Sequence, residues 1–201
     1  QARGYMARRD PMVSDTKQRI LDAALTIFGQ RGYQGSSIDD VAAAAGVTKG
    51  AVYYWFVDKD DLARDLQHLL WARLANEALE SYDGQRPTVD NLERCFEAFV
   101  AATEELPNAL SFLREAWFTP ALDAAGRADQ RDLTGLVQGL LDHGVTRGEL
   151  APFNTEAAAR ILSGALMEAT LYVLEGGDAP SALAVANVLI RSLAVEAQLP
   201  R

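Results

Sequence analysis

The sequence holds few of the residues from which catalytic and metal sites are usually built. Cys95 is its single cysteine, which excludes an intrachain disulfide and a cluster of metal-binding thiolates. The two histidines, His68 and His143, lie far apart with no metal-ligand spacing near either, so surface or polar-pocket roles fit them better than coordination. No Ser/His/Asp set, paired carboxylates or phosphate-binding loop points to an enzyme. We therefore expect no catalytic residue, no metal and no cofactor.

The sequence also lacks a secretory signal and any apolar run long enough to span a bilayer. These absences predict a cytoplasmic protein with no membrane partner. Cys95 falls on an apolar helix face and is interpreted as a small core residue. Redox sensing is the alternative, but the neighbouring Arg94 points elsewhere on a helix and would not lower the pKa of the thiol.

Positive charge is scarce and unevenly distributed. The 201 residues carry 19 Lys and Arg against 28 Asp and Glu, a net charge of −9, which taken alone argues against a nucleic-acid partner. Residues 1–57, however, hold seven basic against five acidic side chains, whereas residues 58–201 hold 12 against 23. The chain thus divides into a mildly basic head and an acidic body. The body would repel DNA and help to orient the head, although solubility is the plainer explanation.

The clearest pattern lies in residues 36–56, which are predicted to form two short helices joined by a tight turn. Ser37 precedes the first helix and Asp40 follows three residues later, which is a capping box with Asp in place of Glu. Gly46 can adopt the left-handed conformation that ends a helix. The apolar face of this helix repeats at intervals of three and four residues, at Ile38, Val41, Ala42 and Ala45.

The second short helix is expected over residues 49–56, with Thr48 as its N-cap. Val52 and Phe56 are predicted to face the core. A lysine and two tyrosines, Lys49, Tyr53 and Tyr54, point outward. A helix with a hydroxyl, a lysine and two tyrosines near its start suits insertion into the major groove of DNA.

In these residues the chain resembles the TetR family of transcriptional regulators. The detailed resemblance covers about the first third of the chain. So many matches in the right order are far more specific than a bare helix-turn-helix pattern. The matching residues are Ile20, Leu21, Ala23, Ala24, Phe28, Gly32, Tyr33, Ser36, Ser37, Ile38, Val41, Ala42, Ala45, Gly46, Val47, Thr48, Gly50, Val52, Tyr53, Trp55, Phe56, Lys59 and Leu62.

The resemblance implies an all-α fold, with an N-terminal three-helix helix-turn-helix DNA-binding domain and a C-terminal helical ligand-binding and dimerisation domain. We place a flexible N-terminal arm at residues 1–13, the DNA-binding domain at 14–57 and the effector-binding and dimerisation domain at 58–201. Arg8 and Arg9 in the arm either reach a DNA backbone or minor groove, or belong to a solvated tail.

The residues predicted to contact operator DNA are Ser36, Ser37, Thr48, Lys49, Gly50, Ala51, Tyr53, Tyr54 and Lys59. Ser36, Ser37 and Lys59 would hold phosphates. Helix capping is the alternative for Ser37 and Thr48, and the two roles are compatible. Packing is the alternative for Tyr53, but the matching tyrosine of the resembled family contacts DNA. The second helix has neither Arg nor Asn, so we expect specificity to rest partly on thymine methyls and DNA shape.

Glycine and proline divide the rest of the chain into further helices. The first helix of the chain is expected from Ser14 or Asp15 to about residue 30, and Asp58 and Thr88 are expected N-caps. Residues 119–126 are predicted to be a loop or a distorted turn. The body helices are expected over residues 58–81, 89–105, 107–118, 127–147, 155–174 and 180–198.

The last predicted helix is apolar almost all round, and the helix before it is rich in alanine and glycine. A helix that is apolar on every side is buried on every side. At the end of a soluble chain this indicates one face on its own core and one on a partner. The two helices therefore predict half of an antiparallel four-helix interface in a homodimer, which is also where the resembled family dimerises.

The body is rich in aromatic side chains, which would bind an apolar or aromatic effector if they lined a cavity. Ordinary core packing is the alternative for each of them. The effector-binding candidates are Trp71, Phe96, Phe99, Phe112, Trp117, Leu136, Leu140, His143, Met167 and Tyr172.

The sequence predicts a dimeric regulator that binds a palindromic double-stranded operator through its head and a small-molecule effector through its body. The resemblance implies a repressor that the effector releases. Two alternatives stay open: an enzyme of similar helical shape, and a helical adaptor that binds another protein through the head. Steeply salt-dependent binding to DNA would distinguish the regulator from both.

Overall fold

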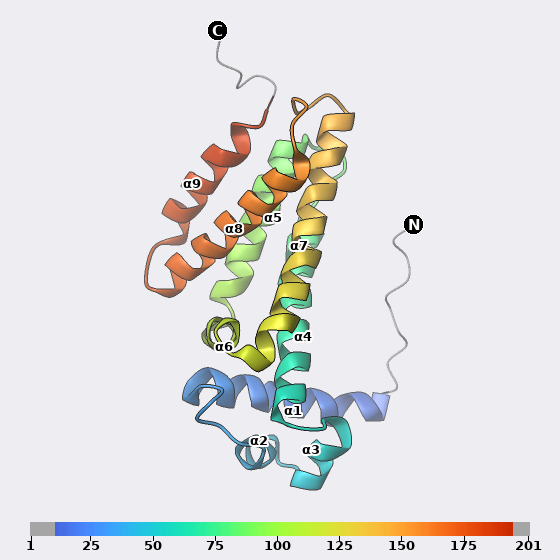
Figure 1. Cartoon of the computed structure of the whole chain (residues 1–201), viewed down its shortest axis with the longest axis vertical. Helices are drawn as coiled ribbons and strands as arrows, with labels where there is room; N and C mark the ends of the chain where they lie inside the picture. Colours follow the sequence, from blue (N-terminus) through green and yellow to red (C-terminus); the bar gives the residue numbers. More distant parts are fainter. Residues whose placement is uncertain (1–10, 195–201) are drawn as a thin grey trace.

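The computed structural model describes residues 11–194 of the chain, whose regular structure is almost entirely helical (Figure 1). The all-α prediction is confirmed. The predicted arm lies almost wholly outside the described residues, Arg8 and Arg9 included. The helices of the described part are α1 (Pro11–Arg31), α2 (Ile38–Ala45), α3 (Lys49–Trp55), α4 (Lys59–Glu80), α5 (Thr88–Glu104), α6 (Pro107–Trp117), α7 (Pro120–Thr146), α8 (Thr155–Leu174) and α9 (Ala179–Arg191).

Helices α1, α2 and α3 gather at one end of the molecule and form the head (Figure 1). Phe28 of α1 and Tyr33 of the following loop are buried and meet edge to face, with 5.5 Å between ring centroids. Val52 of α3 and Phe56 just after it are also buried. The burial of Val52 and Phe56 agrees with their assignment to the core from the sequence.

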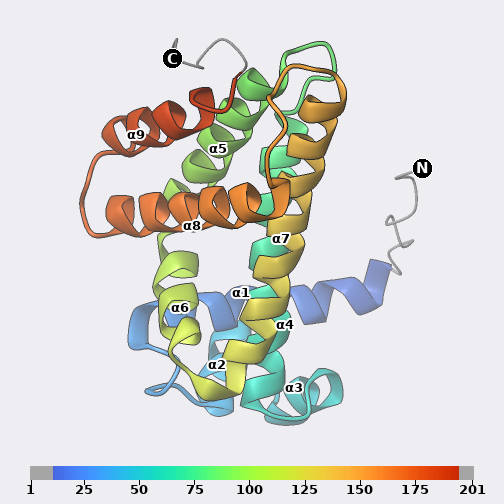
Figure 2. The same ribbon diagram turned by 45° about the horizontal axis from the view of Figure 1, so that its top comes forward.

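Helix α4 links the head to the body. It starts in the head, where the carboxylate of Asp58 accepts the N–H of Asp61 at 2.7 Å, and the predicted cap is thereby confirmed. It then runs beside α7 into the body (Figures 1 and 2). At the far end α8 and α9 lie side by side and pack with α5 (Figure 2). The buried face of α4 includes Leu62, Leu66, Leu70 and Leu74.

The core passes from the head into the body through α6. Phe112 of α6 is fully buried and its ring lies 5.5 Å from that of Phe28, measured between centroids. Helix α6 therefore packs directly on α1, so that the head touches the body at α6 as well as through α4.

The prediction of a loop or a distorted turn over residues 119–126 is wrong, because residues 120–126 are the beginning of α7 and Thr119 is its N-cap. Pro120 occupies the first turn, where proline is tolerated, and Leu122 is fully buried. Gly126 lies inside the helix where α7 meets α4. A β-carbon on Gly126 would stand 2.4 Å from Nε2 of Gln67, so the glycine permits this close approach instead of ending a helix.

Three helix ends also differ from the predictions. Helix α1 starts at Pro11, three residues or more before the expected start. Thr88 is the first residue of α5 and not its cap, and its N–H is bound by the Glu149 carboxylate at 2.6 Å. Helix α9 ends at Arg191, after which the chain turns and Ala194 pairs with Leu150 in a β-bridge. The last part of the predicted helix lies outside the described residues.

None of the helices described between residues 11 and 194 is long and apolar enough to cross a membrane.

Candidate nucleic-acid interface

Helix α2 begins at a capping box and ends at a left-handed glycine, as the sequence predicts. The N–H of Asp40 is bound by the Ser37 hydroxyl at 3.2 Å, and the Asp40 carboxylate accepts the N–H of Ser37 at 2.9 Å. The capping box is thus confirmed, and the bonds from Ser37 hold the pKa of Asp40 below its usual value. Gly46 ends α2 with φ of 64°, the left-handed conformation expected of it.

A contact between residues far apart in the sequence holds the turn between α2 and α3. The Arg19 guanidinium on α1 donates to the carbonyl oxygen of Ala45 at 2.6 Å and to that of Gly46 at 3.3 Å. These carbonyls lie at the end of α2, where backbone acceptors have no partner within the helix. The role of Arg19 was not predicted, since nothing in its sequence neighbourhood indicates a partner 26 residues away.

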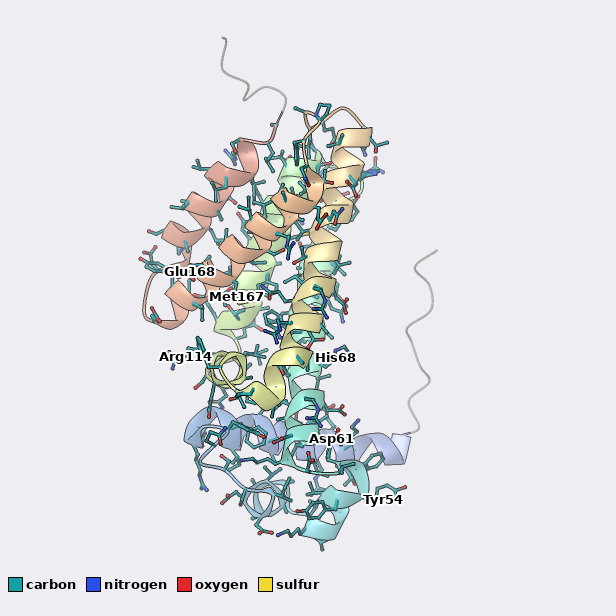
Figure 3. All side chains as sticks on the ribbon, viewed as in Figure 1. Tyr54, Asp61, His68, Arg114, Met167 and Glu168 are labelled. Atoms are coloured by element: carbon teal, nitrogen blue, oxygen red, sulfur yellow. The ribbon has the colours of Figure 1, made fainter. Side chains whose placement is uncertain are left out.

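Helix α3 starts at Lys49 and presents most of the predicted DNA contacts to solvent. The Thr48 hydroxyl accepts the N–H of Ala51 at 3.2 Å, which confirms Thr48 as the N-cap. Gly50 is exposed and Ala51 is half-buried. Tyr53 is about half exposed, and Tyr54, at the end of the head farthest from the body, is 78% exposed (Figure 3). The predicted DNA-facing surface of α3 therefore lies on the outside of the molecule.

Lys49 lies beside an acidic residue that the sequence analysis did not single out. Its ammonium group is 2.9 Å from the carboxylate of Asp39 in the first turn of α2. The hydrogen bond to Asp39 and the charge of that carboxylate raise the pKa of Lys49. Both side chains are exposed, so the pair can open when another anion approaches.

Ser36 and Lys59, predicted to hold phosphates, make their hydrogen bonds inside the head. The Ser36 hydroxyl is buried and donates to the carbonyl oxygen of Gly32 at 2.6 Å. The Lys59 ammonium donates to the carbonyl oxygens of Tyr33 and Ser36 at 2.9 and 3.0 Å, and lies 4.2 Å from the centroid of the Tyr33 ring. Both residues hold the loop between α1 and α2, and phosphate contact by them stays a prediction.

Two carboxylates accept hydrogen bonds from the loop between α1 and α2. Glu115 of α6 accepts the N–H of Tyr33 at 2.6 Å and that of Gln34 at 3.0 Å. Asp60 of α4 accepts the Tyr33 hydroxyl, and burial together with this bond raises the pKa of Tyr33. The loop that leads into α2 is therefore held by side chains from both α4 and α6.

The predicted effector residues do not converge on one cavity. Phe112 packs on α1, and Trp71 packs on Phe99 with 6.3 Å between ring centroids. His143 is exposed, and the side chain of Trp117 lies outside the described part of the structure. A wholly apolar cavity of about 30 Å³, too small for an organic effector, lies between α4, α5, α7 and α8. Among its lining residues are Phe96, Phe99, Leu136 and Leu140.

Two larger hollows lie on α8. One, of about 410 Å³, runs between α8 and α9 and includes Tyr172. The other, of about 280 Å³, lies between α6, α7 and α8 and includes Met167. The outer surface of α8 and α9 also exposes large apolar side chains, of which Ile161, Val185 and Val188 are each about two-thirds exposed.

Comparison with known proteins matches both parts of the chain to one family. Residues 20–66 match the pattern described as bacterial regulatory proteins of the tetR family, and residues 89–196 match the tetracyclin repressor-like C-terminal domain. The second match alone covers more than half of the chain.

Curated relatives are transcriptional regulators with the same kind of head. The regulator SrpR of Pseudomonas putida is 34% identical over 168 residues, which are 78% of this chain and 73% of SrpR. The repressor BepR of Brucella suis is 28% identical over 98% of this chain and all of BepR. AcrR of Shigella flexneri is 41% identical over 76 residues, which span 37% of this chain and only 35% of AcrR.

Solved structures with a similar fold are also TetR-family regulators. A TetR-family regulator from Rhodococcus superposes with a TM-score of 0.78 over 90% of this chain and 99% of its own, at 21% identity. The capped α2–α3 pair, the helical body and the two family matches agree with one another. The chain belongs to the TetR family of bacterial transcriptional regulators.

Proposed function

We propose that this protein is a dimeric repressor that binds a palindromic operator through α3 and is released by a small apolar or aromatic effector. The observation that carries the DNA-binding part is the geometry of α3. Thr48 caps it, Val52 anchors it, and Lys49 at its start and Tyr53 and Tyr54 in its second half are exposed. A short helix held this way is suited to enter the major groove with its N-terminal residues against the bases.

The apolar surface of α8 and α9 supports the dimer. Leaving the exposed side chains of Val185 and Val188 in water is unfavourable in free energy. The 410 Å³ groove between the two helices has room for side chains of a partner helix. A two-fold dimer places two heads on one duplex, which matches an operator made of two half-sites about 34–36 Å apart.

Repression is supported by the relatives, since BepR is described as a repressor. Helices α4 and α6 both grip the loop before α2, so a change in the body alters the placement of α3. An effector shifts this equilibrium only by its differential affinity for the two states. A protein that acts on operator DNA in this way is neither an enzyme nor an adaptor, and it works in the cytoplasm.

The test is selection of an operator from a random duplex pool, followed by anisotropy titration at several salt concentrations. We expect a palindromic site and a linear fall of log affinity with log salt. Lys49→Ala should weaken binding and flatten that slope by at most about one unit. If no duplex is enriched, or the affinity of Lys49→Ala is unchanged, α3 is not the reading helix.

A further inference from the structure

The groove between α6, α7 and α8 has the size of a small-molecule site. Its volume is about 280 Å³. An apolar cavity of about 150 Å³ takes up one benzene molecule, so this groove has room for about two fused rings. Arg114 of α6, and Met167 and Glu168 of α8, lie on the same side of the body (Figure 3) and line it.

Its walls carry three side chains that favour aromatic rings. The guanidinium of Arg114 can stack on an aromatic face. The thioether of Met167 makes favourable contacts with ring edges. Phe118, which is 84% exposed, offers a ring for offset stacking and would be shielded from water by a bound molecule.

The polar groups of the groove set the chemistry of the ring's substituent. Glu168 is exposed at its edge and, like Arg114, forms no ion pair in the part of the chain that the structure describes. Its carboxylate accepts hydrogen bonds only, so it selects a donor such as a phenolic hydroxyl or an arylamine.

The wall formed by α8 has an open position at Gly164. A β-carbon placed there would meet no atom within 4 Å, so the space beside Gly164 is free. Unlike Gly126, Gly164 is not required by close packing. A glycine inside a helix costs stability relative to alanine, and here it leaves room in the groove.

The groove is also connected to the head through α6. Arg114 faces the groove, while the next residue, Glu115, binds the N–H groups of Tyr33 and Gln34 in the head. Adjacent residues on a helix point in different directions, which lets α6 touch a ligand on one side and the head on another. A ligand that moves α6 therefore moves the loop that leads into α2.

We propose that the groove between α6, α7 and α8 binds a planar two-ring aromatic molecule with a hydrogen-bond donor at its edge, and that α6 transmits its binding to the head. The inference rests on the proposed function, because it names the effector class of the regulator. Arg114, Met167 and Phe118 hold the rings, Glu168 accepts from the donor, and Glu115 carries the signal.

The test is fluorescence titration of the full-length protein with 2-naphthol and with naphthalene, which lacks the donor. We expect 2-naphthol to bind about tenfold more tightly, and Glu168→Met to abolish the difference. Gly164→Leu fills the groove and should weaken both ligands at least thirtyfold, whereas Gly164→Ala should stay within threefold of wild type. Melting temperatures and sedimentation confirm that each variant is folded and dimeric, which matters because Glu168 also lines the α8–α9 groove.

Absence of 2-naphthol binding, or binding that Gly164→Leu does not weaken, overturns the site. Transmission is tested with the selected operator: 2-naphthol should weaken operator binding at least fivefold in wild type and less than twofold in Glu115→Ala. An equal effect in both proteins overturns the role of α6. Operator binding without 2-naphthol binding leaves the proposed function standing and refutes this site, whereas failure to bind any operator refutes the proposed function itself.

Discussion

Replacing Asp39 with asparagine should strengthen binding to DNA, including DNA that carries no operator. Asp39 places a carboxylate 2.9 Å from the ammonium of Lys49, on the surface proposed to face DNA. There it competes with phosphates for the lysine and repels them directly. Asn removes the charge at nearly constant size. Because Ser37 pairs with Asp40 and not Asp39 in the capping box, α2 keeps its cap.

The magnitude follows from counterion release. Each phosphate neutralised by a protein adds about 0.9 to the slope of log affinity against log salt. The wild-type lysine is shared between Asp39 and phosphate, so freeing it should enlarge the fall in affinity between 50 and 200 mM salt by at most about 3.5-fold. The gain should therefore be several-fold at low salt and small at high salt.

The assay is fluorescence anisotropy with a labelled random duplex of about two helical turns, which needs no known operator. Lys49→Ala should move the slope in the opposite direction. In the Lys49→Ala background, Asp39→Asn should raise the affinity less than it does in wild type, because only the direct repulsion of phosphates is then relieved. Glu77→Gln, on the exposed side of α4, removes the same charge far along that helix and serves as the control. An equal gain in both charge variants would show that net charge, and not the Asp39–Lys49 pair, sets the affinity, which would refute the reasoning.

Further predictions concern stability and assembly. Ser37→Ala should cost about 1 kcal/mol in urea unfolding by removing an N-cap. Because Ser37 lowers the pKa of Asp40 in the folded state, that part of the stability is present above the usual Asp pKa and is lost as the pH falls through the lowered value. The difference in melting temperature between the variant and wild type should therefore be larger at pH 7 than at a pH below the lowered pKa of Asp40. Phe112→Ala should destabilise the protein by about 3–5 kcal/mol, measured by urea unfolding, since it empties a fully buried site between α1 and α6; a loss below 1 kcal/mol would mean that this contact is not part of the core. Val188→Asp should leave the protomer folded, because Val188 is 68% exposed there, but should shift sedimentation from dimer to monomer; an unchanged dimer would place the interface elsewhere.

The residues around the α2–α3 turn show which features a sequence encodes locally. Ser37 reaches Asp40 within three residues, Thr48 reaches Ala51 within three, and Gly46 needs only its own backbone freedom. Such bonds form between neighbours along the chain, so the same residue types at the same spacing favour them in unrelated proteins. The same holds for the buried side of α3, where Val52 faces inward.

Contacts between distant parts of the chain could not be predicted in this way. Residues 119–126 carry turn-forming residues, yet residues 120–126 are helical and Gly126 packs against Gln67 of α4. The site residues differ for the same reason: Lys59 turns inward to bind the loop after α1, Lys49 acquires Asp39 as a partner, and Glu115 reaches a loop 82 residues before it. Hydrophobic periodicity and capping signals determine where helices form and which faces are buried, because they depend on neighbours a few residues away. Which helix approaches which, and which charge meets which, depends on packing distant segments together, and only the tertiary structure decides it.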